Sequence, residues 1–470
     1  MGPENHHVEL QWDSVVDSRN PHNWPGWKRL YHTVCVALFA FTITYMSSAY
    51  AIGAAQTAQE FGVSQTVSLL GVSLFCLGLS LGPVLGAPLS ETFGRLTVYR
   101  AGFPITVLFL IGSAVGKSIG SVLTCRFFAG LFGSPALSVG GGTIADIWPP
   151  SRRGPATYLF VAAPFLGPCL APVVGGFLVE RMGWRWLEWV SVFLGVGTCV
   201  FALGMRETYK EVILRHHSEK KPGSVKPVRH YLSTLRNWMA LTMLRPMKML
   251  VSEPIVLFLS LYVGFNFAVL YAFFASIPLV FAKTYNFSDS KIGLTFVALG
   301  IGVFLATLTS ILCDKLIYQP KARRALSIGH VSSLPPENRL YPAVMGSLGT
   351  VVGLFWFAWT ARSSVFWLSP VAALIPFNWG NLCIFSTTIV YIIDCYGPQY
   401  GASALSANAF TRYVLAAAFP LFTDQMYNSL TIPWATSLLG FVAVAMVPIP
   451  WILLAFGPKI RSWSRLAHVN

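Results

Sequence analysis

A short polar segment between two apolar stretches places a carboxylate and an arginine on either side of a glycine. These residues are Glu91, Gly94 and Arg95, and Asp146 stands at the end of a later apolar stretch. An acid and a base at the ends of adjacent membrane helices can form an ion pair whose strength changes when the acid is protonated. The alternative is a set of solvated charges that only fixes the membrane topology. We expect Glu91, Arg95 and Asp146 to meet at one membrane surface.

Two arginines, Arg126 and Arg412, lie inside apolar stretches. A charge in the bilayer interior is costly unless it faces a partner or a polar cavity, so we expect each arginine to face one or the other. For Arg412 the sequence leaves structural pairing and substrate contact open. The 18 acidic residues fall outside the apolar stretches or near their ends, so none is marked as a proton carrier. The candidates for gating and proton coupling are Glu91, Arg95, Arg126 and Asp146, with Asp394 and Asp424 as further acids.

The segment 163–176 is rich in residues that disrupt helices. Its three prolines and three glycines would break a helix in water. In a membrane, neighbouring helices and local adjustments satisfy the carbonyl groups that a proline leaves free. The sequence therefore predicts a kinked membrane helix with a smooth face, suited to a contact that moves. The residues singled out on it are Gly167, Pro168, Pro172, Gly175 and Gly176.

Polar side chains within four of the apolar stretches are candidates for a substrate cavity. Taken singly, each is as well explained by hydrogen bonding between helices. Taken together, they could line a central cavity that binds amphipathic molecules. The set consists of Tyr45, Ser48, Tyr262, Asn266, Tyr271, Asn378, Asn381 and Arg412.

The elements that must position these residues follow from the composition. Hydrophobic residues make up 54% of the 470 residues and charged residues 11%, whereas soluble domains carry about 25% charged residues. Apolar runs long enough to cross a bilayer recur along the chain. The fold class expected is an all-α membrane protein, with about twelve transmembrane helices in two pseudo-symmetric six-helix bundles. The predicted spans are 33–55, 67–90, 97–116, 121–145, 156–179, 186–205, 255–281, 291–313, 341–361, 364–393, 400–422 and 431–457.

Charge and polarity suggest how these spans are organised. The longest polar stretch divides the chain into halves of similar length, as in internally repeated transporters. The predicted organisation is an N-terminal segment (1–31), a first bundle (32–206), a linker (207–253), a second bundle (254–457) and a C-terminal tail (458–470). Only six of the 33 Lys and Arg fall in the predicted outer loops: Lys117, Arg181, Arg185, Lys283, Lys291 and Arg362. This bias predicts that the N-terminal segment, the linker and the tail are cytoplasmic.

Several other classes of protein are disfavoured by the same observations. Membrane topology explains the net charge of +15, so we expect no nucleic-acid partner. The eight cysteines are scattered without CxxC spacing, and we expect neither a metal nor a cofactor. An enzyme would need paired acids, a histidine cluster or a nucleophile with its base at the bilayer face, and no such arrangement is visible. One sequon, at Asn286, falls on the predicted outer side, where its closeness to a span argues against glycosylation.

Several segments carry a resemblance to a known family. These are Asp17–Trp24, Pro88–Arg95, Arg126–Gly130, the proline-rich segment 163–176, Gly183–Trp186, Arg206–Tyr209 and Tyr391–Asp394. With them the chain resembles a major facilitator superfamily transporter, and more narrowly the fungal branch of the 12-spanner drug:proton antiporters. Ala87, Leu96, Thr97 and Ala171 depart from the family's motifs. In the second half, only Asp314 and Lys315 echo the loop around Arg95.

The resemblance implies a proton-coupled antiporter that exports a drug, a toxin or a secondary metabolite. It implies a monomer in the plasma membrane whose partners are the lipid bilayer, protons and a small organic substrate. A nutrient importer on the same fold remains the alternative, because only the direction of flux separates the two. Because the spans contain two arginines and no central acid, we expect neutral, weakly acidic or amphipathic substrates rather than polyamines.

Overall fold

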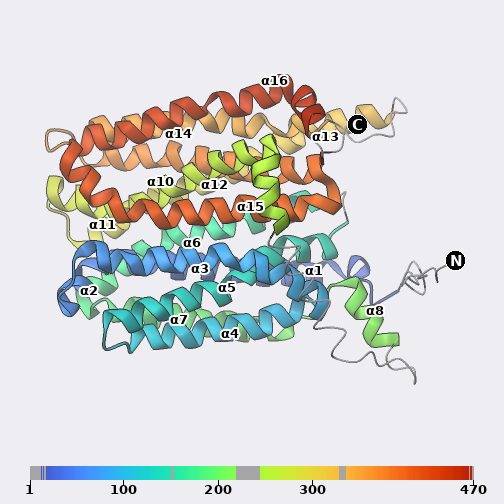
Figure 1. Ribbon diagram of the computed structural model, residues 1–470, viewed down its shortest axis with the longest axis horizontal. Coiled ribbons are helices and arrows are strands. Elements are labelled where there is room, and N and C mark those ends of the chain that lie inside the picture. The colour runs from blue at the N-terminus through green and yellow to red at the C-terminus, as the bar shows by residue number, and fades with distance from the viewer. Residues whose placement is uncertain are drawn as a thin grey trace.

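The computed structural model describes residues 12, 14, 17–149, 153–218, 244–327, 335–464 and 466–467. Within these ranges every regular element is a helix. The helices lie side by side along the long axis of the molecule in two bundles, one from each half of the chain (Figure 1). The predicted all-α fold of two bundles is confirmed.

The first bundle contains the helices before the linker. They are η1 (Pro21–Asn23), α1 (Gly26–Ile52), α2 (Ala54–Phe61), α3 (Gln65–Phe93), α4 (Arg95–Ala114), α5 (Ile119–Ile147), α6 (Arg153–Met182), α7 (Arg185–Phe201) and η3 (Ala202–Gly204). Thus α1 begins a few residues before the predicted start of the bundle at residue 32. The linker opens with α8 (Lys210–Ser218), and residues 219–243 lie outside the described part of the chain.

The second bundle repeats this order of long helices. Its elements are α10 (Pro254–Tyr285), α11 (Asp289–Thr295), α12 (Val297–Cys313), η4 (Asp314–Tyr318), α13 (Gln319–Ser327), η5 (Pro336–Arg339), α14 (Tyr341–Thr360), α15 (Leu368–Met446) and α16 (Pro448–Trp463). The last helix therefore continues beyond residue 457, where the tail was predicted to begin.

The 79 residues of α15 contain two membrane crossings and the first part of a third, which α16 continues. A straight helix of that length would measure about 120 Å, several times the thickness of a bilayer. The backbone leaves the helical conformation at Gly397 (φ 60°, ψ −168°) and at Thr431 (φ 65°, ψ 160°). These two breaks divide α15 into segments that match the predicted tenth, eleventh and early twelfth spans.

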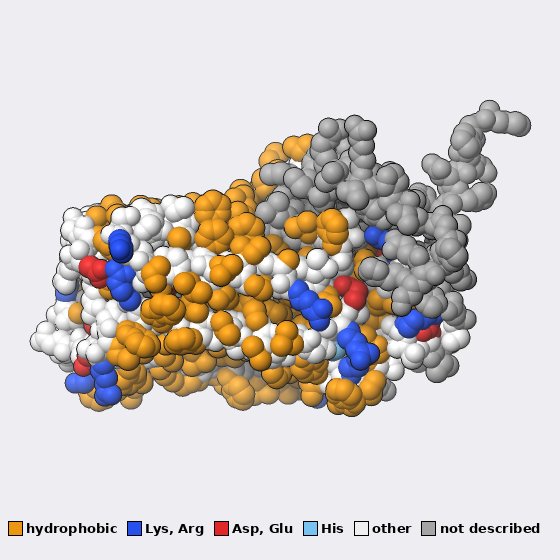
Figure 2. Space-filling view, turned by 90° about the horizontal axis from the view of Figure 1, so that it is seen from below, with side chains coloured by type: hydrophobic (Ala, Val, Ile, Leu, Met, Phe, Trp, Pro, Cys, Tyr) orange, Lys and Arg blue, Asp and Glu red, His pale blue; other side chains and the backbone are white. Residues whose placement is uncertain are grey.

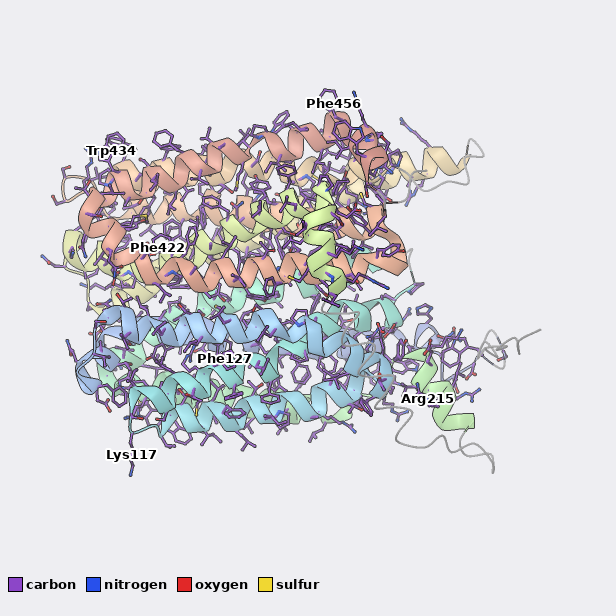
Figure 3. All side chains as sticks on the ribbon, in the orientation of Figure 1. Lys117, Phe127, Arg215, Phe422, Trp434 and Phe456 are labelled. Atoms are coloured by element: carbon purple, nitrogen blue, oxygen red, sulfur yellow. The ribbon has the colours of Figure 1, made fainter. Side chains whose placement is uncertain are left out.

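The bundles have two distinct ends. The end that carries α8 and α13, here called the linker end, lies opposite the end that carries α2 and α11, here called the far end (Figure 1). Lys117 projects at the far end and Arg215 lies at the linker end (Figure 3). Between the ends, the face seen in Figure 2 is covered mainly by hydrophobic side chains, and its charges gather toward the two ends. Such an apolar belt is what a bilayer requires.

Both ends of the linker are attached to the bundle that they adjoin. Glu207 accepts hydrogen bonds from the backbone nitrogens of Arg95 and Leu96, at 2.9 and 3.0 Å, at the start of α4. At the other end of the linker, Glu253 is hydrogen-bonded by Tyr396 of α15 at 3.1 Å and by Ser464 after α16.

Candidate functional site

Arg126 of α5 and Glu188 of α7 form an ion pair inside the first bundle. Arg126 Nη1 lies 2.6 Å from Glu188 Oε1, and the two side chains are 1% and 2% exposed. Removing one member of such a pair would leave a buried, uncompensated charge, which costs about 3–5 kcal/mol. The pair is therefore suited to sense a proton, because protonation of the carboxylate removes one of its two charges.

The other donors of Arg126 fix it to the backbone of two neighbouring helices. Nε donates to Gly71 O of α3 at 2.7 Å, and Nη2 lies 3.1 and 3.2 Å from Met46 O and Ser47 O of α1. Its guanidinium also lies over the rings of Tyr50 and Phe75. Arg126 thus connects three other helices, α1, α3 and α7, through one side chain.

Ser47 extends this connection to the second bundle. Its hydroxyl lies 2.8 Å from the hydroxyl of Tyr271 in α10, and both side chains are fully buried. The chain of contacts Glu188–Arg126–Ser47–Tyr271 therefore joins a buried acid to the interface between the bundles. Arg126 and Tyr271 were predicted from the sequence. Glu188 was not, because an acid in the first turn of a helix usually lies in solvent.

At the linker end, Arg95 binds Asp146 as the sequence analysis expects. Arg95 Nε lies 3.1 Å from Asp146 Oδ2, and Arg95 Nη1 donates to Ser90 Oγ at 2.7 Å. Gly94, which precedes Arg95, has φ +96° and leaves no room for a Cβ beside the Glu207 carboxylate. This group, Arg95 with Asp146, Ser90 and Glu207, is the first latch.

Glu91 contributes to the first latch only at longer range. Burial raises the pKa of Glu91 above the usual value of a glutamate. The positive charge of Arg95 lowers the pKa of Glu91, but this effect is smaller than that of burial. Tyr209, whose ring lies 4.8 Å from the Arg95 guanidinium, has its pKa raised by burial to about 12. The sequence also predicts that Arg152 lies near Glu91 and Asp146, but Arg152 is outside the described residues.

A second latch occupies the matching position in the other bundle. Arg339, just before α14, binds Asp314 at 3.0 Å and Asp394 at 3.1 Å. Asp394 ends the tenth span as Asp146 ends the fourth. The weak sequence echo at Asp314 therefore belongs to a complete latch, whose arginine stands 25 residues away in the chain. No short motif could have indicated that pairing.

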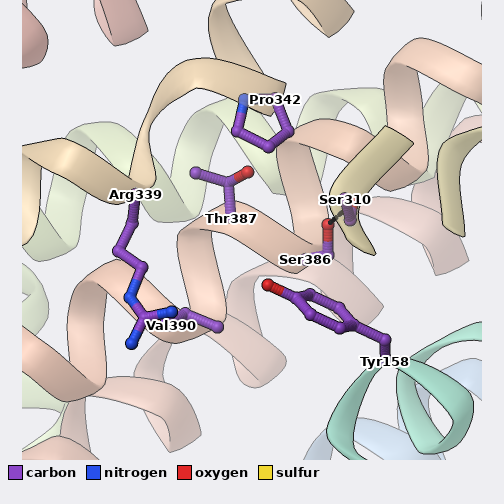
Figure 4. Close-up of a pocket in the computed structure, with 7 residues that line it drawn as sticks. All are labelled: Tyr158, Ser310, Arg339, Pro342, Ser386, Thr387 and Val390. Carbon is purple, nitrogen blue, oxygen red and sulfur yellow. Dashed lines mark hydrogen bonds between the residues drawn. The ribbon is translucent and has the colours of Figure 1, made fainter. Parts of the chain in front are cut away.

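Beside the second latch, the two bundles meet at Tyr158 of α6. Its side chain points from the first bundle toward Ser310, Ser386 and Thr387 of the second (Figure 4). These residues, with Arg339, line a cavity of about 10 Å³, which has room for about one water molecule. Residues of both bundles therefore face one another at the linker end.

The proline-rich segment of α6 forms close contacts on two sides. A Cβ on Gly167 would lie 2.7 Å from the backbone nitrogen of Tyr45 in α1, and one on Gly175 would lie 2.9 Å from Ile52. A Cβ on Gly176 would overlap the backbone of Asp289, at the start of α11 in the second bundle. Pro168 and Pro172 lie inside the same unbroken helix. The segment thus packs α6 against both bundles.

The far end is closed by contacts between the bundles. Ser290 N donates to Glu180 Oε2 at 3.0 Å, and Gln425 Nε2 donates to Thr66 Oγ1 at 3.0 Å. Hydrogen bonds therefore join the bundles at the far end, and residues of both bundles line one small cavity at the linker end.

The predicted cavity residues are all buried, but they separate into two groups. Tyr45 packs with Ala171 of α6 within the first bundle, and Ser48 bonds to carbonyls of its own helix. Tyr262 lies beside Ser347 of α14. The contacts described for these three residues thus lie within their own bundles.

The other predicted cavity residues lie closer to the interface between the bundles. Asn378 Nδ2 donates to Leu299 O at 2.8 Å and lies 3.7 Å from Cys169 Sγ of the first bundle. Asn381 Nδ2 lies 3.4 Å from Asn266 O. Arg412 is 9% exposed and lies among aromatic rings, one of which, Phe267, also contacts Tyr271.

Two bundles of six spans, joined at buried polar residues, invite comparison with known transporters. The family model described as Major Facilitator Superfamily matches residues 34–420. The chain belongs to the major facilitator superfamily. It is a membrane transporter, and the resemblance expected from its motifs is confirmed.

The curated relatives of this transporter are fungal proteins of the same family. It is 39% identical to Polyamine transporter 4 of Saccharomyces cerevisiae, over 98% of this chain and 73% of that protein. It is 36% identical to the Ascochitine biosynthesis cluster MFS transporter of Didymella fabae, over 99% and 90%. It is 39% identical to Efflux pump FUBT of Fusarium oxysporum, over 95% and 75%.

Solved structures of other transporters share the fold. The proton:xylose symporter XylE superposes with a TM-score of 0.65, over 92% of this chain and 96% of that one. At 14% sequence identity, this likeness concerns the arrangement of helices alone.

Proposed function

We propose that this transporter is a proton-coupled antiporter that exports small amphipathic organic molecules by alternating access. The observation that carries the proposal is the buried ion pair between Arg126 and Glu188, 2.6 Å apart. Export is supported by relatives that are named as efflux pumps or as transporters of biosynthetic clusters. An importer would use the same parts with the opposite direction of flux.

Glu188 is the proton carrier in this proposal. Its protonation removes the charge that Arg126 faces, while Arg126 remains bonded to the backbone of α1 at Met46 and Ser47. Ser47 is also bonded to Tyr271 of the second bundle. Protonation of Glu188 therefore alters the contacts at the interface between the bundles, which must open during transport. Arg95 and Arg339 each fix helix ends within their own bundle at the linker end, and the contacts of α6 with α11 hold the far end closed.

The linker end faces the cytoplasm in this proposal. The bias of Lys and Arg toward the segments at that end supports this orientation, and the plasma membrane is the location that export of a small molecule requires. We further propose that one chain carries a complete transport path, because the interface lies between its own two bundles.

Flux measurements in proteoliposomes test the coupling. With an imposed proton gradient, wild-type protein should move an amphipathic dye against its gradient. Glu188→Gln, which imitates the protonated acid, should abolish this driven movement but retain exchange of labelled for unlabelled dye. The exposed Glu211→Gln serves as the matched control and should behave as wild type. Full gradient-driven movement by Glu188→Gln would overturn the assignment of the proton carrier.

A further inference from the structure

We infer that Arg412 is the counter-charge for an anionic substrate, so that the transported molecule is an organic acid with an apolar, planar body. This inference rests on the proposed function, because it specifies the substrate of the same central interface. It selects one class from the neutral, weakly acidic and amphipathic molecules that the sequence leaves open.

The first support is a buried positive charge with no acid beside it. Arg412 is nine-tenths buried, its Nε has no hydrogen-bond partner, and none of the ion pairs among the described residues includes it. Other deeply buried arginines in the described chain do have carboxylate partners: Arg126 has Glu188 and Arg461 has Glu337. Arg412 therefore lies in the bilayer interior without a negatively charged partner, and a bound anion would supply that partner.

The second support is the aromatic surround of the guanidinium. Its Cζ lies 5.0 Å from the ring centre of Phe267, 4.6 Å from that of Phe385 and 4.7 Å from that of Tyr413. Cation–π contacts lower the cost of the buried charge without neutralising it. An aromatic acid could place its carboxylate on Arg412 and its ring against these faces, whereas a flexible chain of amines could do neither.

The third support is the position of this cage between the bundles. Phe165 of α6, in the first bundle, lies 5.7 Å from Phe267 and 4.9 Å from Phe385, both in the second. Phe267 is also 5.2 Å from Tyr271, the residue bonded to Ser47 of the first bundle. An anion bound at Arg412 would thus lie beside two rings, Phe267 and Phe385, that pack against Phe165 of the first bundle.

The relative from Saccharomyces cerevisiae is named as a polyamine transporter. Polyamines carry positive charge, whereas the substrate inferred for this chain carries negative charge. A polycation would meet Arg412 as a like charge in a low-dielectric interior, where repulsion is strongest. We therefore expect competition between organic acids and no competition from spermidine.

A pair of probes that differ only in charge tests the inference. The purified full-length protein in lipid nanodiscs is equilibrated with 2-naphthoate or with the isosteric 2-naphthamide, and binding is measured by equilibrium dialysis. We expect wild type to bind the carboxylate at least tenfold more tightly than the amide. Arg412→Gln should lose this preference and keep its affinity for the amide, and Arg412→Lys should keep part of it. The exposed Arg362→Gln is the matched control and should resemble wild type.

Three outcomes would overturn the inference: equal affinity for the two probes, binding of neither probe, or an equal loss of both in Arg412→Gln. A monodisperse elution profile for each variant separates loss of binding from loss of folding, and Arg412→Lys preserves the charge if Arg412→Gln does not fold. Preference for the carboxylate without any proton-driven flux would contradict the proposed antiport and leave this inference standing. Proton-driven flux of neutral dyes without that preference would support the proposed antiport and contradict this inference.

Discussion

Among single residues, the buried charges decide most of the behaviour expected of this transporter. Arg126 and Glu188 neutralise each other, whereas Arg412 is surrounded by aromatic rings and lacks an acid. Of these two arginines in membrane spans, Arg126 is thus already paired with an acid and Arg412 is not. The first loses stability when its partner is removed, and the second gains an interaction when an anion arrives.

Replacement of Glu188 by alanine should destabilise the protein markedly. The variant leaves Arg126 buried and uncompensated, at a cost of about 3–5 kcal/mol, which appears as a lower melting temperature in detergent. The double variant Glu188→Ala with Arg126→Met removes both charges and should recover most of the loss. If the double variant is no more stable than the single one, the pair is not held together by its charges.

The acid at the first latch should make stability depend on pH. Burial raises the pKa of Glu91 above its usual value, so the folded protein favours the neutral form of this side chain. The contribution of Glu91 to stability is therefore present at low pH and is lost as pH rises through the raised pKa. Relative to wild type, Glu91→Gln should become progressively more stable as the pH rises from the usual pKa of 4.5 through the raised pKa of Glu91. Melting temperatures across this range check the trend, and a constant difference would contradict it.

At the scale of elements, the proline-rich helix α6 contacts helices of both bundles. Its glycines take α6 to the backbone of α1 on one side and of α11 on the other. A helix with side chains at these positions would stand farther from its neighbours. Small residues at helix contacts in a membrane allow this approach because packing, rather than burial from water, holds membrane helices together.

Enlargement of Gly176 should hold the far end open. A Cβ at this position overlaps the backbone of Asp289, so Gly176→Val should reduce transport at least tenfold. Spin labels on non-canonical residues at positions 117 and 362, on different bundles at the far end, should move apart. Gly141 of α5 has open space around its Cβ position, and Gly141→Ala should leave both measurements unchanged.

At the scale of the whole molecule, the two bundles carry matching latches at the same end. Arg95 binds Asp146 in the first bundle, and Arg339 binds Asp314 and Asp394 in the second. Each latch ties together helices of one bundle, and Tyr158 brings the first bundle against the residues beside the second latch. We therefore expect opening of the linker end to involve both latches.

Loss of both latches should shift the conformational balance toward opening at the linker end. Arg95→Gln and Arg339→Gln each remove one arginine, and the double variant should show the longest distance between labels placed on α8 and α13. The separation of labels at positions 117 and 362 at the far end provides the internal control and should not lengthen. Unchanged distances at the linker end in the double variant would show that the latches do not govern opening.

The sequence predicted the fold well because each span can be recognised from one continuous stretch of apolar residues. Arg126 was identified for the same reason, since a charge in such a run is conspicuous. The pairing of Arg126 with Glu188, 62 residues apart, and of Arg339 with Asp394, 55 residues apart, depends on the packing order of the helices. The cavity role of Tyr45 and Tyr262 stays a prediction, because the sequence of a membrane helix does not reveal which neighbour a polar residue faces.

The anchoring of the linker by Glu207 and Glu253 has a consequence for how the protein is assembled. Glu207 binds the start of α4, and Glu253 binds Tyr396 and Ser464 through one carboxylate oxygen, so these hydrogen bonds of each acid lie within its own bundle. We therefore expect each half of the chain to fold into its own bundle. Two polypeptides produced together, one ending after α8 and the other beginning before α10, should find each other in the bilayer and reconstitute a working carrier.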